Sequence, residues 1–185
     1  MLLYSGNTLF FPTVVLGVAM AGGIFTGANP TYVTRELSYQ LKDSGARFLI
    51  CTESSLETGV QAAKQANLSI SNVFLFDDEV ATFEGRKVEK DMLDGKIRHW
   101  TTLLDSKEKG RAYHWPELKT EEELDRVVAL NYSSGTTGVA KGVMITHKNY
   151  VANCLYVSLG YRVGFETLLI CSIAGLDSRY TSPSK

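Results

Sequence analysis

The sequence predicts an α/β fold in which helices cover the faces of a mostly parallel sheet. A helical pattern and a short apolar run follow each other twice between residues 34 and 76, and short apolar runs are typical of strands buried on both faces. Because parallel strands need a crossover connection, this alternation favours right-handed helix–strand units over hairpins. With 185 residues, the chain is long enough for one substantial core or for one domain with an extension.

The first expected helix runs from residue 10 or 12 to about residue 20. Pro12 suits the first turn of a helix, and Gly22 and Gly23 are expected to end it. The helix is apolar all round, which is typical of burial on every side. A membrane segment or signal peptide is the alternative, but no lysine or arginine precedes Arg35, and the run is short and interrupted by glycines. We therefore expect a buried core helix.

The second expected helix follows a turn at residues 28–30, Ala-Asn-Pro. Thr34 is expected to be its N-cap and Gly45 to stop it. Leu37 and Leu41, one turn apart, form the face that would lie on the sheet.

Two apolar runs with a helical pattern between them follow. Residues 47–51 and 72–76 are expected to be strands, and residues 54–66 a helix. The apolar positions of that helix recur at helical spacing, at Leu56, Val60 and Ala63. Three acidic residues at 77–79 close the second strand.

The pattern weakens between residues 77 and 119, where charges, glycines and isolated aromatics such as Trp100 predict a surface excursion with short helical pieces. Thr120 and Glu123 then match a capping box that opens a short helix. Residues 147–159 predict an amphipathic helix. Its expected apolar side consists of Val151, Cys154, Leu155, Ser158 and Leu159.

A loop rich in glycine and hydroxyl groups lies between two expected strands. From Ser133 to Gly142 it holds three glycines, four serine or threonine hydroxyls and Lys141, with apolar runs at 127–130 and 143–145. Glycines let the backbone approach a ligand closely, and amide, hydroxyl and ammonium groups all donate to phosphate. The composition predicts a nucleotide-phosphate loop. The alternative is a hairpin loop without a ligand, with Lys141 in solvent.

The loop differs from the common phosphate-binding motifs. A Walker A loop has serine or threonine directly after its lysine, but Gly142 follows Lys141 here. A strand at 143–145 is expected where P-loop and Rossmann sites have the N-terminus of a helix. The sequence therefore points to another class of nucleotide site.

Residues 130–147 closely resemble the signature of the adenylate-forming superfamily, which includes acyl-CoA synthetases, 4-coumarate-CoA ligase-like enzymes, luciferases and peptide-synthetase adenylation domains. That signature is a Ser/Thr-Gly-Thr-Thr-Gly core, two variable residues, Lys-Gly, and a short strand ending in Thr-His. The matching residues are Ser133 through Gly138, Lys141, Gly142, Thr146 and His147. Ala140 stands where the family often has proline.

A second stretch supports the same resemblance. Residues 21–30, followed by Arg35-Glu36-Leu37, are similar to the family segment that runs from a buried helix through an Asn-Pro turn into the next helix. The resemblance covers roughly residues 5–160 and is closest to the 4-coumarate-CoA ligase-like branch. It implies a partial N-terminal domain of the adenylate-forming fold at residues 1–160, with the C-terminal domain absent. Residues 161–185 would be a divergent, unstructured tail.

The resemblance also implies an activity and a site. Family members use ATP to convert a carboxylic acid into an acyl-adenylate and pyrophosphate, and coenzyme A then takes the acyl group as a thioester. Lys141 would act in catalysis, and Mg²⁺ would accompany ATP, although no metal ligand can be named. The residues expected to bind the ATP phosphates are Ser133, Ser134, Gly135, Thr136, Thr137, Gly138 and Lys141.

Other parts of the family's site have no counterpart in this sequence. The adenine- and ribose-binding motifs and the lysine of the C-terminal domain are missing, so we expect an incomplete and inactive slice of an acyl-CoA ligase. The alternatives are a non-catalytic module that binds ATP or pyrophosphate or regulates a longer relative, and a small membrane-anchored protein. Cut sheet edges would favour self-association.

The composition excludes several other classes. A net charge of −1 gives no electrostatic reason to expect nucleic acid or an anionic membrane as a partner. Cys51, Cys154 and Cys171 are widely spaced among apolar neighbours, which predicts buried free thiols in a reducing compartment. We expect no metal site, no membrane span, and a cytoplasmic or peroxisomal location.

Overall fold

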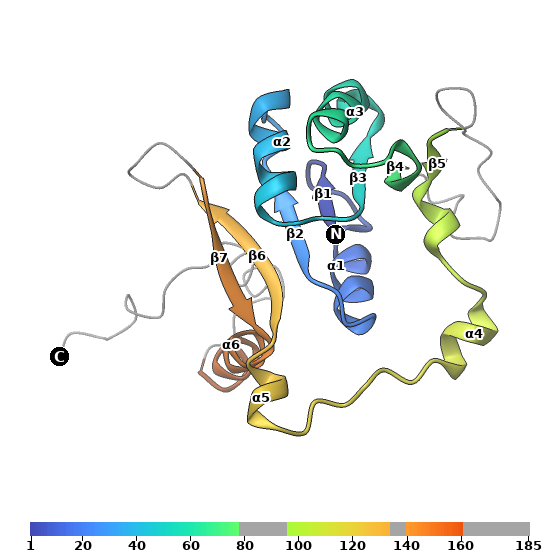
Figure 1. Ribbon diagram of the computed structural model, residues 1–185. Coiled ribbons are helices and arrows are strands. Elements are labelled where there is room, and N and C mark those ends of the chain that lie inside the picture. Colours follow the sequence, from blue (N-terminus) through green and yellow to red (C-terminus); the bar gives the residue numbers. More distant parts are fainter. Residues whose placement is uncertain (78–95, 134–139, 161–185) are drawn as a thin grey trace. The chain divides into compact units, whose positions relative to one another are not determined.

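The computed structural model describes residues 1–77, 96–133 and 140–160. The chain divides into two compact units, Met1–Glu117 and Leu118–Lys185. Each unit is built around its own strands (Figure 1). The predicted tail at residues 161–185 lies outside the described residues.

The first unit holds a parallel sheet, as the sequence predicted. Its strands are β1 (Leu2–Tyr4), β2 (Phe25–Ala28), β3 (Leu49–Thr52), β4 (Val73–Phe76) and β5 (Arg98–His99). They lie in the order β5-β4-β3-β1-β2, and each neighbouring pair is parallel. The order reverses direction at β1, because the chain first moves outward to β2 and then returns to build β3 to β5 on the other side.

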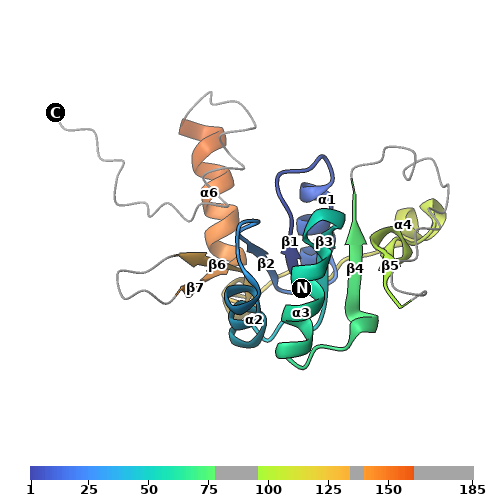
Figure 2. The ribbon, with the colours of Figure 1, turned by 90° about the horizontal axis from the view of Figure 1, so that it is seen from above.

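Helices cover both faces of this sheet. α2 (Thr34–Asp43) and α3 (Leu56–Gln65) pack on one face, and α1 (Phe11–Met20) packs on the other, as Figure 2 shows. Successive strand residues alternate between the two cores, so Leu49 and Cys51 face α2 and α3 while Ile50 faces the α1 side. Burial on both sides explains the continuous apolar runs in the sequence.

Glycines end two of these helices, as predicted. Gly22 and Gly45 have φ of 72° and 61°, a left-handed conformation that a residue with Cβ adopts at a cost. After Gly45, the backbone N–H of Ala46 donates to the Leu41 carbonyl at 3.2 Å, which closes the last turn of α2.

The predicted start of α2 is wrong by one residue. Val33 is the N-cap and Thr34 is the first helical residue. The backbone N–H of Val33 is satisfied by the Glu36 carboxylate at 3.0 Å, so the acidic residue three positions on does the capping. The Thr34 hydroxyl instead donates to Gln61 of α3.

The prediction that α1 is buried on every side is also wrong. Phe10 and Val14 are buried in the core beneath α1, whereas Leu16 is 54% and Met20 41% exposed. Only one face of the helix lies on the sheet, and its outer face is open among the described residues. None of the helices in the described part of the chain combines the length and apolar character that a membrane crossing requires.

Three strands of the first unit were not predicted. β2 ends at Ala28, which was expected to belong to a turn. β1 has three residues, too few for a periodic signal, yet it lies between β3 and β2 and is fully buried. β5 lies in the stretch expected to be a surface excursion. That expectation is wrong for residues 97–100, where Ile97, His99 and Trp100 are buried.

His99 fixes the edge of the sheet at β5. Its Nε2 lies 3.1 Å from Oδ2 of Asp77, and its Nδ1 lies 2.8 Å from Oγ1 of Thr101. Thr101 thus hydrogen-bonds one side of the buried imidazole, whereas Asp77 faces the other side at ion-pair distance without hydrogen-bond geometry. Beyond it, α4 (Lys107–Ala112) is exposed, in agreement with the predicted short helical pieces.

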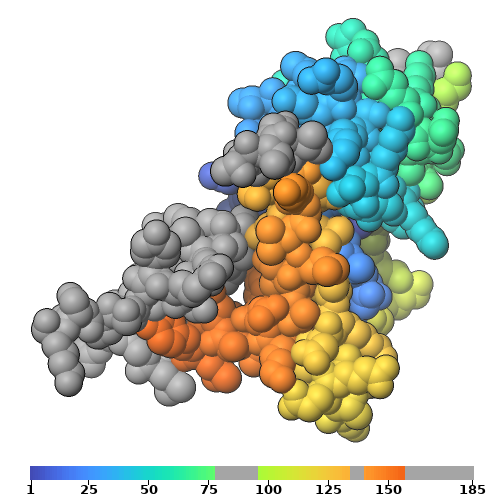
Figure 3. All heavy atoms as spheres, turned by 60° about the vertical axis from the view of Figure 1, so that its left-hand side comes forward, coloured from blue at the N-terminus to red at the C-terminus, as the bar shows by residue number. Residues whose placement is uncertain are grey.

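The second unit contains a hairpin between two helices. α5 (Glu121–Leu124) precedes the antiparallel strands β6 (Val127–Ser133) and β7 (Lys141–Thr146), and α6 (His147–Gly160) follows. All four elements were predicted. Much of β7 and α6 is exposed, on the face shown in Figure 3.

The expected apolar side of α6 is not a buried side among the described residues. Val151 and Leu155 are about half exposed, and Cys154 is exposed although a buried thiol was predicted. The partly buried side carries His147, Tyr150 and Asn153, which recur at helical spacing. Polar residues therefore mark the inner side of this helix. Cys51 is buried as predicted, and Cys171 lies outside the described residues.

Candidate functional site

The β6–β7 hairpin brings the two ends of the predicted phosphate loop together. Ser133, the last residue of β6, is the cross-strand partner of Lys141, the first residue of β7. Directly opposed residues of an antiparallel pair place their side chains on the same face, about 5 Å apart at Cβ. The hydroxyl and the ammonium group thus start from neighbouring positions at the mouth of the loop.

Both of these residues are exposed. No carboxylate of the described residues forms an ion pair with Lys141, so no described side chain neutralises its charge. Ser134, Gly135, Thr136, Thr137 and Gly138 lie outside the described residues. Their predicted contacts with phosphate remain a prediction.

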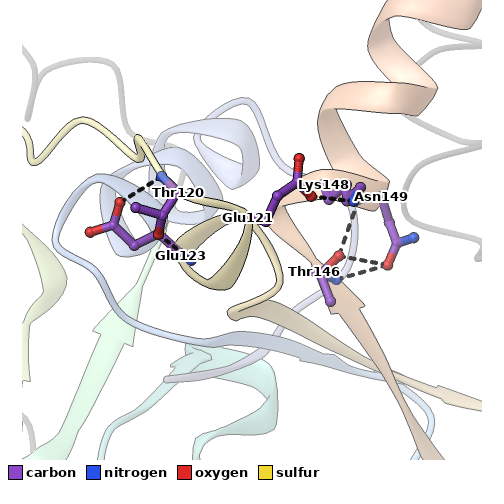
Figure 4. A network of polar contacts seen from close by, with 6 residues as sticks. All are labelled: Thr120, Glu121, Glu123, Thr146, Lys148 and Asn149. Atoms are coloured by element: carbon purple, nitrogen blue, oxygen red, sulfur yellow. Dashed lines mark hydrogen bonds and ion pairs between the residues drawn. The ribbon is translucent and has the colours of Figure 1, made fainter.

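The far end of the hairpin is fixed by the cap of α6. The backbone N–H and hydroxyl of Thr146 donate to Oδ1 of Asn149 at 3.1 and 2.9 Å, and the Asn149 N–H donates back to the Thr146 hydroxyl at 3.2 Å (Figure 4). This is the reciprocal geometry of a capping box, with asparagine in place of the usual glutamate. Thr146 of the signature therefore has a structural role: it joins β7 to α6 without a gap.

A second capping box opens α5. The Thr120 hydroxyl accepts from the Glu123 N–H at 3.2 Å, and the Glu123 carboxylate accepts from the Thr120 N–H (Figure 4). The same carboxylate also accepts from the N–H of Lys119. These two backbone bonds, that from Lys119 first, lower the pKa of Glu123. The prediction made from Thr120 and Glu123 is confirmed.

An ion pair joins the two helices that flank the hairpin. The Lys148 ammonium group donates to the Glu121 carboxylate (Figure 4). This hydrogen bond, together with the charges of Glu121 and Asp125, raises the pKa of Lys148. Two lysines of the hairpin region thus differ: Lys148 is paired, whereas Lys141 is presented to solvent.

The sequence matches a known family over almost its whole length. The family described as AMP-binding enzyme matches residues 1–180. The chain belongs to this AMP-binding enzyme family. The predicted relationship is therefore confirmed.

Curated members of the AMP-binding family share about a third of their residues with this chain over the matched region. Phenylacetyl-CoA ligase epaB of Aspergillus niger is 34% identical over 172 residues, covering 92% of this chain and 30% of the relative. 4-Coumarate--CoA ligase-like 1 of Arabidopsis thaliana is 32% identical over 157 residues, covering 84% of this chain and 24% of the relative. The chain thus spans less than a third of the length of these AMP-binding enzymes.

Solved structures show the same fold. A red-emitting luciferase from Phrixothrix hirtus superimposes with a TM-score of 0.66 at 21% identity, over 85% of this chain and 28% of the luciferase. ATP-bound MatB from Rhodopseudomonas palustris gives a TM-score of 0.56 at 22% identity, over 87% of this chain and 27% of MatB. The predicted partial N-terminal domain of the adenylate-forming fold is confirmed.

The described residues of this AMP-binding chain contain no cluster of potential metal ligands. Among them, no group of three or more histidine, cysteine, aspartate or glutamate side chains could hold an ion.

The structure does add one residue that the sequence did not single out. Tyr132 lies opposite Gly142 in the hairpin, and an aromatic residue directly before the Ser133–Gly142 run was the available signal.

Proposed function

We propose that the β6–β7 hairpin binds the phosphates of ATP in an acyl-CoA ligase that activates a carboxylic acid. The observation that carries this proposal is the pairing of Ser133 with Lys141, both exposed, at the mouth of a glycine- and hydroxyl-rich loop. Membership in the AMP-binding family supports ATP as the nucleotide. The names of the curated relatives, all CoA ligases, support a thioester of coenzyme A as the product.

The chemistry of activation suits this set of residues. A carboxylate oxygen attacks the α-phosphorus of ATP, the bond to the bridging oxygen breaks, and pyrophosphate leaves with the electron pair. Hydroxyls of Ser133, Ser134, Thr136 and Thr137 donate to the β- and γ-phosphates, and Gly135 and Gly138 permit close approach of the backbone. Lys141 places a positive charge where negative charge builds up on the leaving group. Mg²⁺ would accompany ATP and would help to neutralise the charge of the phosphates.

We further propose that this chain binds ATP without completing the reaction alone. It spans at most 30% of the length of the curated relatives compared above, so the sites for the carboxylic acid and coenzyme A would need residues beyond this span. Catalysis of adenylation depends on holding several groups in one geometry, and a subset of them gives little rate.

Calorimetric titration of the 185-residue chain with pyrophosphate and with Mg²⁺–ATP tests the binding. Lys141→Ala should weaken pyrophosphate binding at least about tenfold, because a charge-assisted contact is lost. Lys148→Ala is the matched control: this lysine is paired with Glu121 and should not affect affinity. Equal effects of the two substitutions would refute a specific role of Lys141.

Exchange of labelled pyrophosphate into ATP tests catalysis. With a panel of aryl and fatty acids, no exchange is expected from this chain. Acid-dependent exchange that disappears in Lys141→Ala would show that the chain is active by itself and would overturn the second proposal.

A non-catalytic module that associates with a longer relative or with itself is the second candidate. Exposed apolar side chains favour it: Leu16 on α1 and Met144 on β7 are 54% and 69% exposed, and open apolar surface promotes association. Light scattering during size-exclusion chromatography would detect self-association as a mass that rises with concentration. A monomer at all concentrations would exclude self-association. Association with a longer relative would then be tested by co-elution with an acyl-CoA ligase.

A further inference from the structure

The phosphate-binding end of the hairpin contains one unusually close contact across its two strands. A Cβ placed on Gly142 would lie 3.0 Å from Cζ, 3.2 Å from Cε2 and 3.2 Å from the hydroxyl oxygen of Tyr132. The tyrosine ring therefore lies directly over the backbone of Gly142, its cross-strand partner. An aromatic ring that covers a strand glycine in this way compensates for the missing side chain.

Gly142 is the single position of β7 that can accept the ring. The strand reads Lys-Gly-Val-Met-Ile-Thr from Lys141 to Thr146. Every residue except Gly142 carries a Cβ, which would take up the space that the ring needs above the backbone. A slip of one residue would set Tyr132 opposite Lys141 or Val143 and would turn the side chains of the strand to the other face. The contact thus selects one register.

Burial does not select that register near the loop. Val143 and Met144 are 51% and 69% exposed, so burial of one face does not distinguish the two sides of β7 here. At the far end, the register shifts between Val127 and Ala129. A bulge of this kind absorbs an extra residue, so pairing at the far end does not dictate pairing at the mouth of the loop.

We propose that the packing of Tyr132 on Gly142 sets the register of the hairpin and thereby holds Ser133 opposite Lys141 for phosphate binding. This inference rests on the proposed function of the hairpin. Because adjacent strand residues point to opposite faces, the ring occupies one face and the Ser133–Lys141 pair occupies the other. Tyr132 is a positioning residue: it touches Gly142, and it acts on phosphate only through the residues whose pairing it fixes.

The test is a double-mutant cycle on the full chain, since coupling between two contacting residues appears as non-additivity. Gly142→Ala is made in the wild type and in Tyr132→Thr, a background that keeps β propensity but removes the ring. With the ring present, the added methyl group overpacks the contact and should lower pyrophosphate affinity about tenfold. Without the ring, the same substitution should be neutral or favourable, because alanine is better than glycine in a strand interior. The expected result is a reversal of sign.

Two further variants separate positioning from general stability. Tyr132→Phe keeps Cζ and Cε2 of the ring and should bind pyrophosphate with nearly wild-type affinity. Gly27→Ala is the matched control: a Cβ placed on this strand glycine would lie 3.7 Å from the Phe25 ring, an ordinary contact that leaves room for a methyl group. The midpoint of thermal unfolding should change little in Gly142→Ala while affinity falls. A shift in the midpoint with unchanged affinity would overturn the positioning role.

Amide hydrogen exchange in the hairpin is measured on the same variants, so the inference can be judged apart from the proposed function. Faster exchange at residues 132 and 142 in Gly142→Ala, reversed in the Tyr132→Thr background, supports the register role. Equal exchange effects in both backgrounds would overturn it. If the wild type binds no pyrophosphate while exchange still shows the reversal, the phosphate-binding proposal fails and the register contact stands as a structural feature only.

Discussion

The strands of the first unit and the hairpin of the second are built on different principles. In β3 and β4, every residue except Thr52 is at most 1% exposed, because helices cover both faces of the sheet. In β7, Val143 and Met144 are 51% and 69% exposed. The parallel strands are held by burial, which is large and non-directional. In β6, Val128 and Ala129 are buried, but near the loop the hairpin depends on individual contacts between named residues.

This difference separates stability from chemistry along the chain. Burial on both faces leaves no side chain of β3 or β4 except Thr52 free to meet a charged ligand. The exposed end of the hairpin keeps Ser133 and Lys141 accessible, and the Tyr132–Gly142 contact replaces burial as the source of order. A site for a polyanion needs this combination of accessible donors and fixed pairing.

Truncation of one large side chain in each unit gives the largest expected contrast. Leu75→Ala, at a fully buried position of β4, should lower the free energy of unfolding by about 2–5 kcal/mol, since it leaves a cavity between the sheet and α3. Met144→Ala should change it by less than about 0.5 kcal/mol, because little surface is buried there. Urea denaturation followed by circular dichroism measures both. Similar losses would mean that the hairpin, too, is held by burial.

The second contrast concerns glycines that differ in the space around them. A Cβ on Gly59 of α3 would lie 2.9 Å from Sγ of Cys51, so Gly59→Ala should destabilise the protein by about 1–3 kcal/mol through overpacking. Gly17 of α1 has no atom within 4 Å of its built Cβ, so Gly17→Ala should stabilise by about 0.5–1 kcal/mol through helix propensity.

A rescue experiment identifies the cause of the Gly59 effect. In a Cys51→Ala background the sulfur is gone, and most of the cost of Gly59→Ala should disappear. Thermal unfolding of the four combinations measures this. A cost that persists in Cys51→Ala would place the strain elsewhere, for example at Leu49, whose Cδ2 lies 3.5 Å from the same position.

The sequence predicted the helices of the first unit but only two of its five described strands. Helices α1, α2 and α3 and strands β3 and β4 follow from apolar periodicity and glycine stops, because burial imposes that periodicity. β1 and β5 have three and two residues, and pairing with longer neighbours, not their own sequence, makes them strands. The buried His99 looks polar in the sequence, and only its contacts with Asp77 and Thr101 explain its place.

The candidate site divides in the same way. The signature located the loop and Lys141, since residue types and order carry that information. The role of Tyr132 follows from register, a property of two strands that no single stretch of sequence contains. The prediction of burial on every side of α1 was wrong, and the apolar side predicted for α6 is exposed at Val151 and Leu155. Apolar composition indicates which face a helix can bury, but not whether another part of the chain covers that face.

The pH dependence of stability provides a third contrast, between the two described cysteines. Burial raises the pKa of the Cys51 thiol from 9.0 to about 12. The unfolded chain therefore loses this proton first as pH rises, and Cys51 should contribute a decline in stability between about pH 9 and pH 12, of at most about 1.4 kcal/mol per pH unit. The slope should be smaller in Cys51→Ala, measured by urea denaturation at several pH values.

Cys154→Ala is the matched control for this measurement, because the Cys154 side chain is exposed. The slope in this variant should equal that of the wild type. Alkylation by iodoacetamide at pH 8, read by peptide mass spectrometry, should likewise modify Cys154 and spare Cys51 in the native protein, since the thiolate is the reactive form. Rapid modification of Cys51 would show that β3 opens easily and that burial does not protect it.

The smallest expected effect concerns the ion pair between Lys148 and Glu121, which is exposed on both sides. The hydrogen bond to Glu121 is the main cause of the raised pKa of Lys148, so Glu121→Gln should lower that pKa, as a nitrogen-detected NMR titration of the lysine would show. A raised lysine pKa adds stability that is present below the pKa of the unfolded chain and is lost as pH rises through the folded value. Because water and salt screen exposed charges, the unfolding midpoint at neutral pH should hardly move, and added salt should remove the remaining difference. A large loss of stability in Glu121→Gln would mean that the ion pair contributes more than the two capping boxes to holding α5 and α6 at the end of the hairpin. The hairpin would then depend on charge as well as on side-chain fit.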